Sequence, residues 1–324
     1  MKGKHRVKVS GSRVKYDFEL TRNITIVQGK SGSGKTTLYD MISSYARLKE
    51  KSGVQVFCDK NCIALRPDTD WKIILNRTSD SIVFIDEEAD YVNTDEFASE
   101  IKRTDNYYVI FNRENLHNLP YSVEEIYEIH TSGKLHSLKK IYKQQSGCRY
   151  FLNGEGMKNR QFSVLLCEDS KSGYEFYNDC FKGTNIECLS AGSNSSVYSW
   201  LLNNKKKDIL VVADGAAFGA EMNRVMAIQA LFPNIQICLP ESFEWLILKS
   251  GLIKEEHLDD IMTNPAEYIE SSNYFSREQF FSDFLIRATE WTYYRYSKNY
   301  LSDFYMIKTN EEKIVALIGL KNKI

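Results

Sequence analysis

The stretch from Asn23 to Leu38 reads NITIVQGKSGSGKTTL and decides how the first half of the chain folds. Its apolar run, Ile24 to Val27, is typical of a short β-strand, and it leads directly into a glycine-rich segment. The residues that follow, Leu38 to Tyr45, carry their apolar side chains at helical spacing. The pattern therefore predicts a strand, a glycine loop and a helix in immediate succession.

The glycine loop has the composition of a phosphate-binding site. Glycines let backbone N–H groups fold closely around an anion, and the helix N-terminus adds a partial positive charge. Lys35 would neutralise the β and γ phosphates of ATP, and the Thr36 hydroxyl would bind Mg²⁺. The alternative is a glycine-rich turn that binds nothing. The residues predicted to surround the phosphates are Gly29, Lys30, Ser31, Gly32, Ser33, Gly34, Lys35, Thr36 and Thr37.

A second apolar run ends in carboxylates. SIVFIDEE, from Ser81 to Glu88, predicts a buried parallel strand whose carboxyl end lies at the edge where α/β sheets bind ligands. Asp86 would hold Mg²⁺, and Glu87 would orient or deprotonate the attacking water. The next strong strand candidate ends in Asn112, a candidate sensor of the γ-phosphate, followed by the weaker candidate Arg113. A simple strand-ending Asn in a turn explains Asn112 as well.

Two further segments of the first half read as β-hairpins. Residues 5–20 alternate apolar and polar side chains around a Ser-Gly-Ser turn, which predicts a hairpin at the sheet edge near the nucleotide. Residues 124–142 predict two strands around a second turn. His130 and His136 flank that turn without a carboxylate or Cys partner at ligand spacing, so both are interpreted as surface residues.

These motifs, in this order, resemble the P-loop NTPases over residues 1–145. The resemblance is carried by GKSGSGKT and IVFIDE. It implies an ATPase that uses ATP and Mg²⁺, and the DEE ending fits an ATPase better than a small-molecule kinase. A P-loop kinase or a nucleotide-dependent motor is the alternative.

The 324 residues are enough for two domains of ordinary size. Glycines in a polar stretch after residue 146 mark the boundary, so we expect an ATPase domain over 1–150, a second domain over 160–250 and a mostly helical region over 251–324 packed on the second domain. The net charge of −1 gives no general attraction to nucleic acid or membranes. The sequence contains neither an apolar run long enough to span a bilayer nor the pattern of a signal peptide. The absence of both predicts a cytoplasmic protein.

The second half shows a new alternation of strands and helices, which indicates a second parallel sheet. The strand-bearing stretches are residues 162–168, 186–192, 208–219 and 235–248. Carboxylates fall where these strands end, at Glu168, Asp169, Asp214, Glu241 and Glu244. Clusters of this kind assemble Mg²⁺ or Mn²⁺ sites for phosphodiester chemistry. The alternative is that they are solvated or cap helices.

This order of strands and acids resembles the TOPRIM domain, in particular that of the overcoming-lysogenization-defect nucleases and of ATPase plus TOPRIM antiphage systems. The resemblance implies metal or acid/base positions for Glu168 and Asp214, with Glu241 and Glu244 in support. SAGSNSS resembles the glycine turn of that domain. Ala216 departs from the pattern, because TOPRIM enzymes usually carry a second Asp there. The departure leaves open a one-metal nuclease, a site completed by Glu241 or Glu244, or an inactive scaffold.

Near the C-terminus, TEWTYYRYSKNY interleaves aromatic rings with Arg295 and Lys298. Such a stretch suits stacking of single-stranded nucleic acid, although more often it is a helix packed on its own domain or on another subunit. Taken together, the motifs predict an ATPase whose nucleotide state controls a metal-dependent nuclease acting on DNA or RNA, in a homo-oligomer or hetero-complex. The alternative is an ATP-driven sensor or assembly protein whose TOPRIM-like half is inactive and binds a partner.

Overall fold

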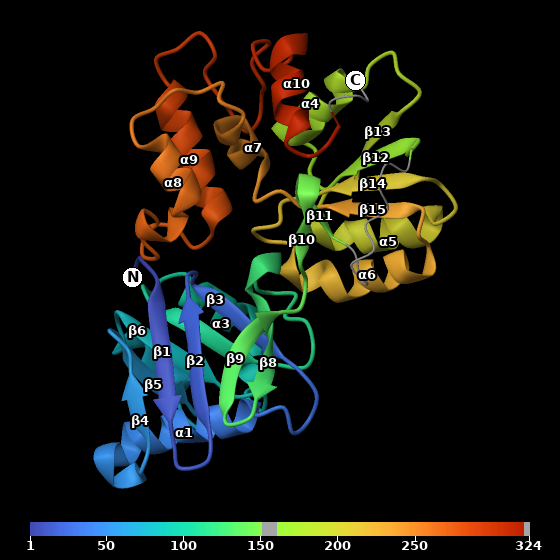
Figure 1. Cartoon of the computed structure of the whole chain (residues 1–324). Helices are drawn as coiled ribbons and strands as arrows, with labels where there is room; N and C mark the ends of the chain where they lie inside the picture. Colours follow the sequence, from blue (N-terminus) through green and yellow to red (C-terminus); the bar gives the residue numbers. More distant parts are fainter. Residues whose placement is uncertain (151–160, 321–324) are drawn as a thin grey trace. The chain divides into compact units, whose positions relative to one another are not determined.

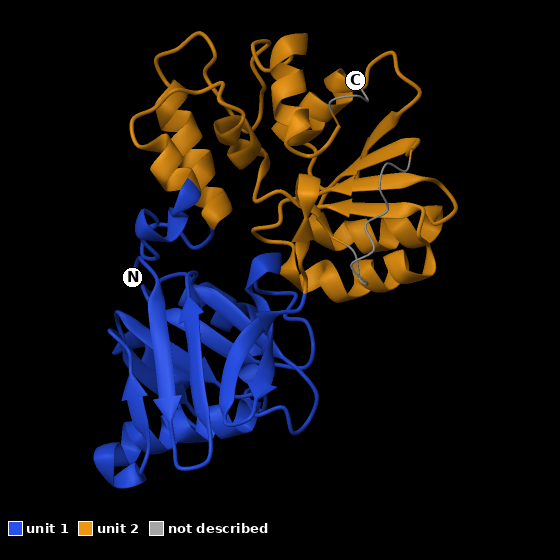
Figure 2. Ribbon diagram, in the orientation of Figure 1, with its two compact units in different colours: residues 1–141, 263–276 blue, residues 142–262, 277–324 orange. Residues whose placement is uncertain are grey.

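The computed structural model describes residues 1–150 and 161–320 (Figure 1). The chain forms two compact units, each containing a sheet and helices (Figure 2). The first comprises Met1–Ile141 and Thr263–Ser276, and the second comprises Tyr142–Met262 and Arg277–Ile324. Residues 251–324 were expected to pack as a whole on the second domain, whereas Thr263–Ser276 packs with the first unit.

The first unit contains a mixed nine-stranded sheet that nearly closes on itself. Its strand order is β4-β1-β2-β9-β8-β3-β7-β6-β5. The strands are β1 (His5–Ser10), β2 (Lys15–Leu20), β3 (Ile24–Gln28), β4 (Gln55–Phe57), β5 (Asn61–Leu65), β6 (Ser81–Ile85), β7 (Tyr107–Phe111), β8 (Ile126–Ser132) and β9 (Leu135–Lys140). The helices are α1 (Lys35–Leu48), α2 (Trp71–Asn76) and α3 (Asp95–Ile101). The strands at the two ends, β4 and β5, follow one another in the chain.

The sheet is mixed because both predicted hairpins join it. Strand β1 pairs antiparallel with β2, and β8 pairs antiparallel with β9. The strands β5, β6, β7, β3 and β8 run parallel and carry the predicted loop and acidic motif at their carboxyl ends. The first hairpin does not form the sheet edge as predicted, because β4 pairs with the outer side of β1. Strand β5 and helix α3 were not predicted.

Helix α1 packs inside the curl of this sheet and contacts β1, β4, β5 and β6. Leu38 and Ile42 are fully buried in a core to which Val9 and Phe84 also contribute. The helix begins where Leu38 N–H donates to the carbonyl of Gly34, at 3.0 Å. Because α1 continues directly from the glycine loop, burial of its apolar face fixes the position of that loop.

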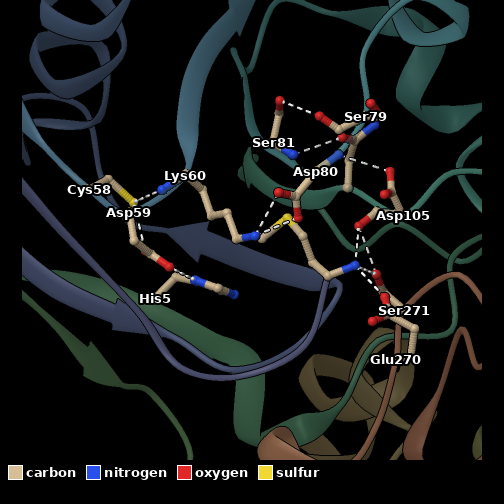
Figure 3. Close-up of polar contacts among 12 residues, drawn as sticks. His5, Cys58, Asp59, Lys60, Ser79, Asp80, Ser81, Asp105, Glu270 and Ser271 are labelled. Atoms are coloured by element: carbon tan, nitrogen blue, oxygen red, sulfur yellow. Dashed lines mark hydrogen bonds and ion pairs between the residues drawn. The ribbon is translucent and has the colours of Figure 1, made fainter.

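A polar network holds the returning segment, residues 263–276, on the first unit (Figure 3). The Ser271 hydroxyl donates to the Asp105 carbonyl at 2.7 Å, and an Asp105 carboxylate oxygen accepts from the Asp80 N–H at 2.9 Å. The Asp80 carboxylate in turn binds the Lys60 ammonium at 2.5 and 2.6 Å. The network therefore links the turn between β4 and β5 to the N-terminal ends of β6 and β7.

The second unit contains a mixed six-stranded sheet of order β10-β11-β15-β14-β12-β13. Its strands are β10 (Gln144–Gln145), β11 (Arg149–Tyr150), β12 (Val164–Cys167), β13 (Glu187–Ser190), β14 (Ile209–Val212) and β15 (Ile235–Cys238). Its helices are α4 (Ser172–Cys180), α5 (Asn194–Asn204), α6 (Met222–Leu231), α7 (Phe243–Lys249), α8 (Leu258–Thr263), α9 (Arg277–Thr289) and α10 (Lys308–Ala316). The last four strands in the chain pair in parallel, as predicted.

The predicted strand-bearing stretch over residues 235–248 contains a strand followed by a helix. Strand β15 ends at Cys238, and α7 begins after Ser242, whose hydroxyl accepts from the Trp245 N–H at 3.1 Å. This cap satisfies a free N–H of the first helical turn. The C-terminal segment is helical in α8, α9 and α10. Within residues 1–150 and 161–320, no helix is both long enough and apolar enough to cross a membrane.

Candidate functional site

The glycine loop connects β3 to α1 and is shaped by a close contact. Gly34, immediately before α1, has a φ of 100°, a backbone conformation that glycine adopts without strain. A Cβ atom at Gly34 would lie 3.0 Å from the Tyr16 hydroxyl. That hydroxyl donates to the Gly34 carbonyl at 2.9 Å. Side-chain bulk is therefore excluded at this position by both conformation and space.

The Lys35 side chain folds back over the loop and is only 4% exposed. Its ammonium donates to the Gly29 carbonyl at 2.6 Å and to the Lys30 carbonyl at 3.3 Å, and its Nζ lies 3.5 Å from the Ser33 hydroxyl. A Glu87 carboxylate oxygen lies 3.7 Å from the same nitrogen. The ammonium thus sits among oxygen acceptors at the loop, where phosphate oxygens could take the place of the carbonyls.

The predicted acidic residues lie at the same edge of the sheet as the loop. Strand β6 ends immediately before Asp86 and Glu87, and β7 alone separates β6 from β3. The Glu87 carboxylate makes a two-point ion pair with Arg113, at 3.1 and 2.5 Å. This ion pair, with help from Lys35, holds the pKa of Glu87 below its usual range. Glu87 is therefore ionised and held between two cations.

Thr36 and Asp86 suit the Mg²⁺ that accompanies a nucleoside triphosphate. Thr36 lies in the first turn of α1 and is exposed. Asp86 is half-buried, and burial raises its pKa, with smaller contributions from the charges of Glu88 and Glu87. A hydroxyl and one carboxylate fit this ion, because protein-bound Mg²⁺ completes its shell with water and phosphate oxygens.

Asn112 and Arg113 lie at the end of β7, which pairs with both β3 and β6. The Asn112 carboxamide oxygen accepts from the Glu114 N–H at 3.1 Å. This is the strand-ending turn that was the alternative to a phosphate sensor. Arg113, the weaker candidate, forms the two-point ion pair with Glu87.

Two residues beside the loop were not predicted as part of the site. His136 was interpreted as a surface residue, but it is buried and its ring stacks on Tyr16 at a centroid distance of 4.8 Å. The His136 Nδ1 atom lies 3.0 Å from the Thr131 hydroxyl. Strand pairing between β2 and β9 brings Tyr16 and His136 together, so no local sequence signal reveals the contact. His130 is exposed, as predicted.

The second unit brings two of its predicted acids side by side. Glu168 follows β12, Asp214 lies two residues after β14, and these strands are neighbours in parallel register. The Asp214 N–H donates to a Glu168 carboxylate oxygen at 3.1 Å. The Asp214 carboxylate accepts from the Phe243 N–H at 3.1 Å. Glu168, Asp169 and Asp214 line a cavity of about 20 Å³, enough for one water molecule.

Glu244 extends this carboxylate centre, although its contacts differ from those predicted. Its side chain is 2% exposed, one oxygen accepts from the Tyr296 hydroxyl at 2.8 Å, and the other has no partner among the described residues. The Lys298 ammonium lies 3.8 Å from Glu244 and donates to Glu278 at 2.8 Å. Although partial burial disfavours the charged form, Glu244 and Glu278 raise the pKa of Lys298.

Burial dominates the electrostatics of the centre. Burial raises the pKa of Glu168 to about 8, against the hydrogen bond from the Asp214 N–H. The pKa of Asp214 is also raised, first by burial and then by the charges of Glu278, Glu168 and Glu244. The Asn194 carboxamide faces Glu168, and its nitrogen donates to both carboxylate oxygens in the orientation that satisfies the two groups. The buried acids are therefore protonated more readily than exposed acids.

In this arrangement the predicted acids do not form a metal site. Among the side chains that the structure describes, no three of the His, Cys, Asp and Glu residues are placed to hold a metal ion. Glu168 and Asp214 are bound by protein donors, and Lys298 supplies a positive charge. Glu241 does not line the cavity, and its carbonyl accepts from the Ala216 N–H at 3.1 Å.

Three members of the centre were not predicted. Asn194 lies in SAGSNSS, which was noted only for its glycine turn. Tyr296 and Lys298 lie in the aromatic C-terminal stretch, more than a hundred residues after Glu168. Only the tertiary fold brings these side chains to the carboxylates.

The raised pKa of Glu168 predicts how the stability of the second unit depends on pH. Between the ordinary pKa of a glutamate and about 8, the unfolded chain releases a proton that the folded chain keeps. We therefore expect the free energy of unfolding to fall as pH rises through this window, and Glu168→Gln to reduce that slope. Lys298 does not contribute to this slope. Its pKa is raised from 10.5, so its ammonium stays protonated in both the folded and the unfolded chain throughout the window.

Thermal unfolding of the whole chain, followed by calorimetry in EDTA buffer at several pH values, measures this slope. Glu187→Gln is the matched control, because Glu187 is 58% exposed on β13. An unchanged slope in Glu168→Gln would show that Glu168 titrates normally.

Comparison with known proteins leaves both sites to be interpreted from their own geometry. The chain has no significant match to a protein-family model, a curated protein or a solved structure.

Proposed function

We propose that the first unit is a P-loop NTPase that binds and hydrolyses ATP. The observation that carries the proposal is Lys35, a nearly buried lysine whose ammonium is held over the glycine loop by two loop carbonyls. The helix N-terminus beside it favours an anion, and phosphate is the anion that such a loop recognises. The acidic strand end at the same edge of the sheet supports hydrolysis rather than binding alone.

In this mechanism each residue has a separate task. Lys35 exchanges its carbonyl contacts for the β and γ phosphate oxygens. Thr36 and Asp86 would hold Mg²⁺, which neutralises phosphate charge when bound. Glu87, ionised under its ion pair with Arg113, accepts the proton of the attacking water.

Substitution of Lys35 and Glu87 separates binding from hydrolysis. We expect Lys35→Ala to lose most ATP binding, because the phosphates lose their cation. Glu87→Gln should still bind ATP but hydrolyse it about 10²- to 10⁴-fold more slowly, since a general base is removed. Equilibrium binding of a fluorescent ATP analogue and phosphate release measure the two effects.

Lys51→Ala is the matched control for the lysine, because Lys51 is exposed and follows α1. ATP binding that survives Lys35→Ala undiminished would contradict the phosphate-loop assignment. Full turnover by Glu87→Gln would remove Glu87 from the mechanism while leaving ATP binding intact.

Arg113→Gln tests the ion pair through the pH dependence of turnover. Arg113 lowers the pKa of Glu87, so its removal raises that pKa and Glu87 becomes protonated at a higher pH. We expect the acid limb of the kcat profile to move to higher pH. Arg103→Gln is the control, because Arg103 is 78% exposed and pairs with Glu100. An acid limb that stays in place would show that Arg113 does not tune Glu87.

A second candidate function concerns the second unit: a TOPRIM-like, metal-dependent nuclease controlled by the nucleotide state of the first. The pairing of Glu168 with Asp214 at neighbouring strand ends favours it. Ala216 and the Lys298 charge favour the alternative, an inactive TOPRIM-like unit that binds a partner in an ATP-driven sensor or assembly protein. The same proposal includes membership of the P-loop and TOPRIM families, action in antiphage defence, and assembly into a homo-oligomer or a hetero-complex.

A nuclease assay decides between these two functions. If the unit is a nuclease, the whole chain should cut DNA or RNA in Mg²⁺ or Mn²⁺, and Glu168→Ala should reduce the rate by about 10²-fold or more, because a residue of the reacting centre is removed. Glu187→Ala is the exposed control. Equal cutting by wild type and Glu168→Ala would assign the activity to a contaminant and favour the partner-binding alternative.

A further inference from the structure

The C-terminal segment of the second unit exposes aromatic side chains that neither site uses. Trp291, Tyr293 and Tyr300 are 91%, 83% and 65% exposed. Large aromatic side chains are usually buried for the most part, and a group of exposed ones marks a binding surface. The same stretch also supplies Tyr296, which is buried against the carboxylate centre, so the exposure of its neighbours is not a sign of an unpacked segment.

This surface is hollowed into a groove of about 760 Å³, within the range of ligand sites. The groove is lined by residues between Tyr293 and Ile307, including Arg295, Tyr300 and Asp303. We call it the aromatic groove. It shares no residue with the phosphate loop or with the side chains of the carboxylate centre.

The walls of the aromatic groove are held in place before any ligand binds. Tyr293 meets Phe304 edge to face at 5.7 Å, and Tyr294 packs on Phe304 at 4.8 Å. The Tyr305 hydroxyl donates to the Tyr294 carbonyl at 2.8 Å, and the Asn310 side chain donates to the Phe304 carbonyl at 2.8 Å. A site built in advance loses less conformational entropy on binding.

Arg295 provides an available positive charge in the aromatic groove. Its neighbours in sequence are paired, since Lys298 binds Glu278 and Arg287 binds Asp283. Arg295 is exposed and makes no ion pair with any described residue. An exposed guanidinium beside aromatic rings suits a phosphate next to a stacked base.

We propose that the aromatic groove binds single-stranded nucleic acid. Bases stack on Tyr293 and Tyr300, and Arg295 contacts the phosphate between them. The Asp303 carboxylate accepts from an exocyclic amino group, so adenine and cytosine are preferred over thymine and uracil, which lack one. The exposed Trp291 outside the groove offers a further stacking surface, which favours a strand over a free nucleotide. If the second unit is a nuclease, this groove defines its substrate class.

Fluorescence anisotropy of labelled oligodeoxyadenylate with the whole chain tests the proposal. The Lys35→Ala background removes binding by the phosphate loop. Tyr293→Ala and Tyr300→Ala should each weaken binding about five-fold or more, because base–aromatic stacking is lost, while Tyr293→Phe should retain it. Arg295→Gln should make the slope of the logarithm of the binding constant against the logarithm of the salt concentration shallower by about one. Oligothymidylate should bind more weakly than oligodeoxyadenylate. Asp303→Ala should reduce this difference in affinity between the two strands.

The controls are Tyr268→Ala and Arg103→Gln, which remove an exposed tyrosine and an exposed arginine of the first unit. Absence of strand binding at low salt, or equal affinity in all variants, would overturn the proposal. So would AMP binding as tightly as a strand, or self-association that is lost in Tyr293→Ala and Tyr300→Ala without strand binding. Glu168→Ala should keep strand affinity, so loss of cutting and loss of binding remain distinguishable.

Discussion

The burial of helix α1 in the curl of the first sheet is the constraint on which the glycine loop depends. Leu38 and Ile42 are fully buried, so the helix cannot shift along or rotate about its axis without losing apolar contacts. Its first residue is Lys35, and the Tyr16 hydroxyl binds the Gly34 carbonyl just before it. The ammonium and the helix N-terminus are therefore held where an anion would meet both.

Charge balance organises the second unit in a different way. Two acids at neighbouring strand ends share a buried setting in which Coulomb repulsion is weakly screened. Burial raises the pKa of both acids, backbone N–H groups donate to them, and the Lys298 ammonium lies 3.8 Å from the neighbouring Glu244. A divalent cation at this centre would meet the positive charge of that lysine.

The local parts of both sites were predictable from sequence because each depends on neighbouring residues. The glycine loop, the acidic ends of β6 and β12, and both hairpins follow from spacing and turn composition. The pairing between distant segments was not predictable in this way. The pairing of β4 with the outer side of β1 was not predicted. His136 carries no sequence signal of burial, because its burial comes from β9 lying beside β2.

The sequence by itself determined that the chain is an α/β protein with a glycine loop between a strand and a helix, an acidic strand end and a second set of strand-end acids. These features need only local rules: glycine conformations, apolar periodicity and the exit of parallel strands at one edge. The tertiary structure alone decided that Arg113 holds Glu87, that Lys298 reaches the buried acids, and that Tyr293 and Tyr300 remain exposed. Those outcomes depend on which surfaces pack together, and packing is a property of the whole chain.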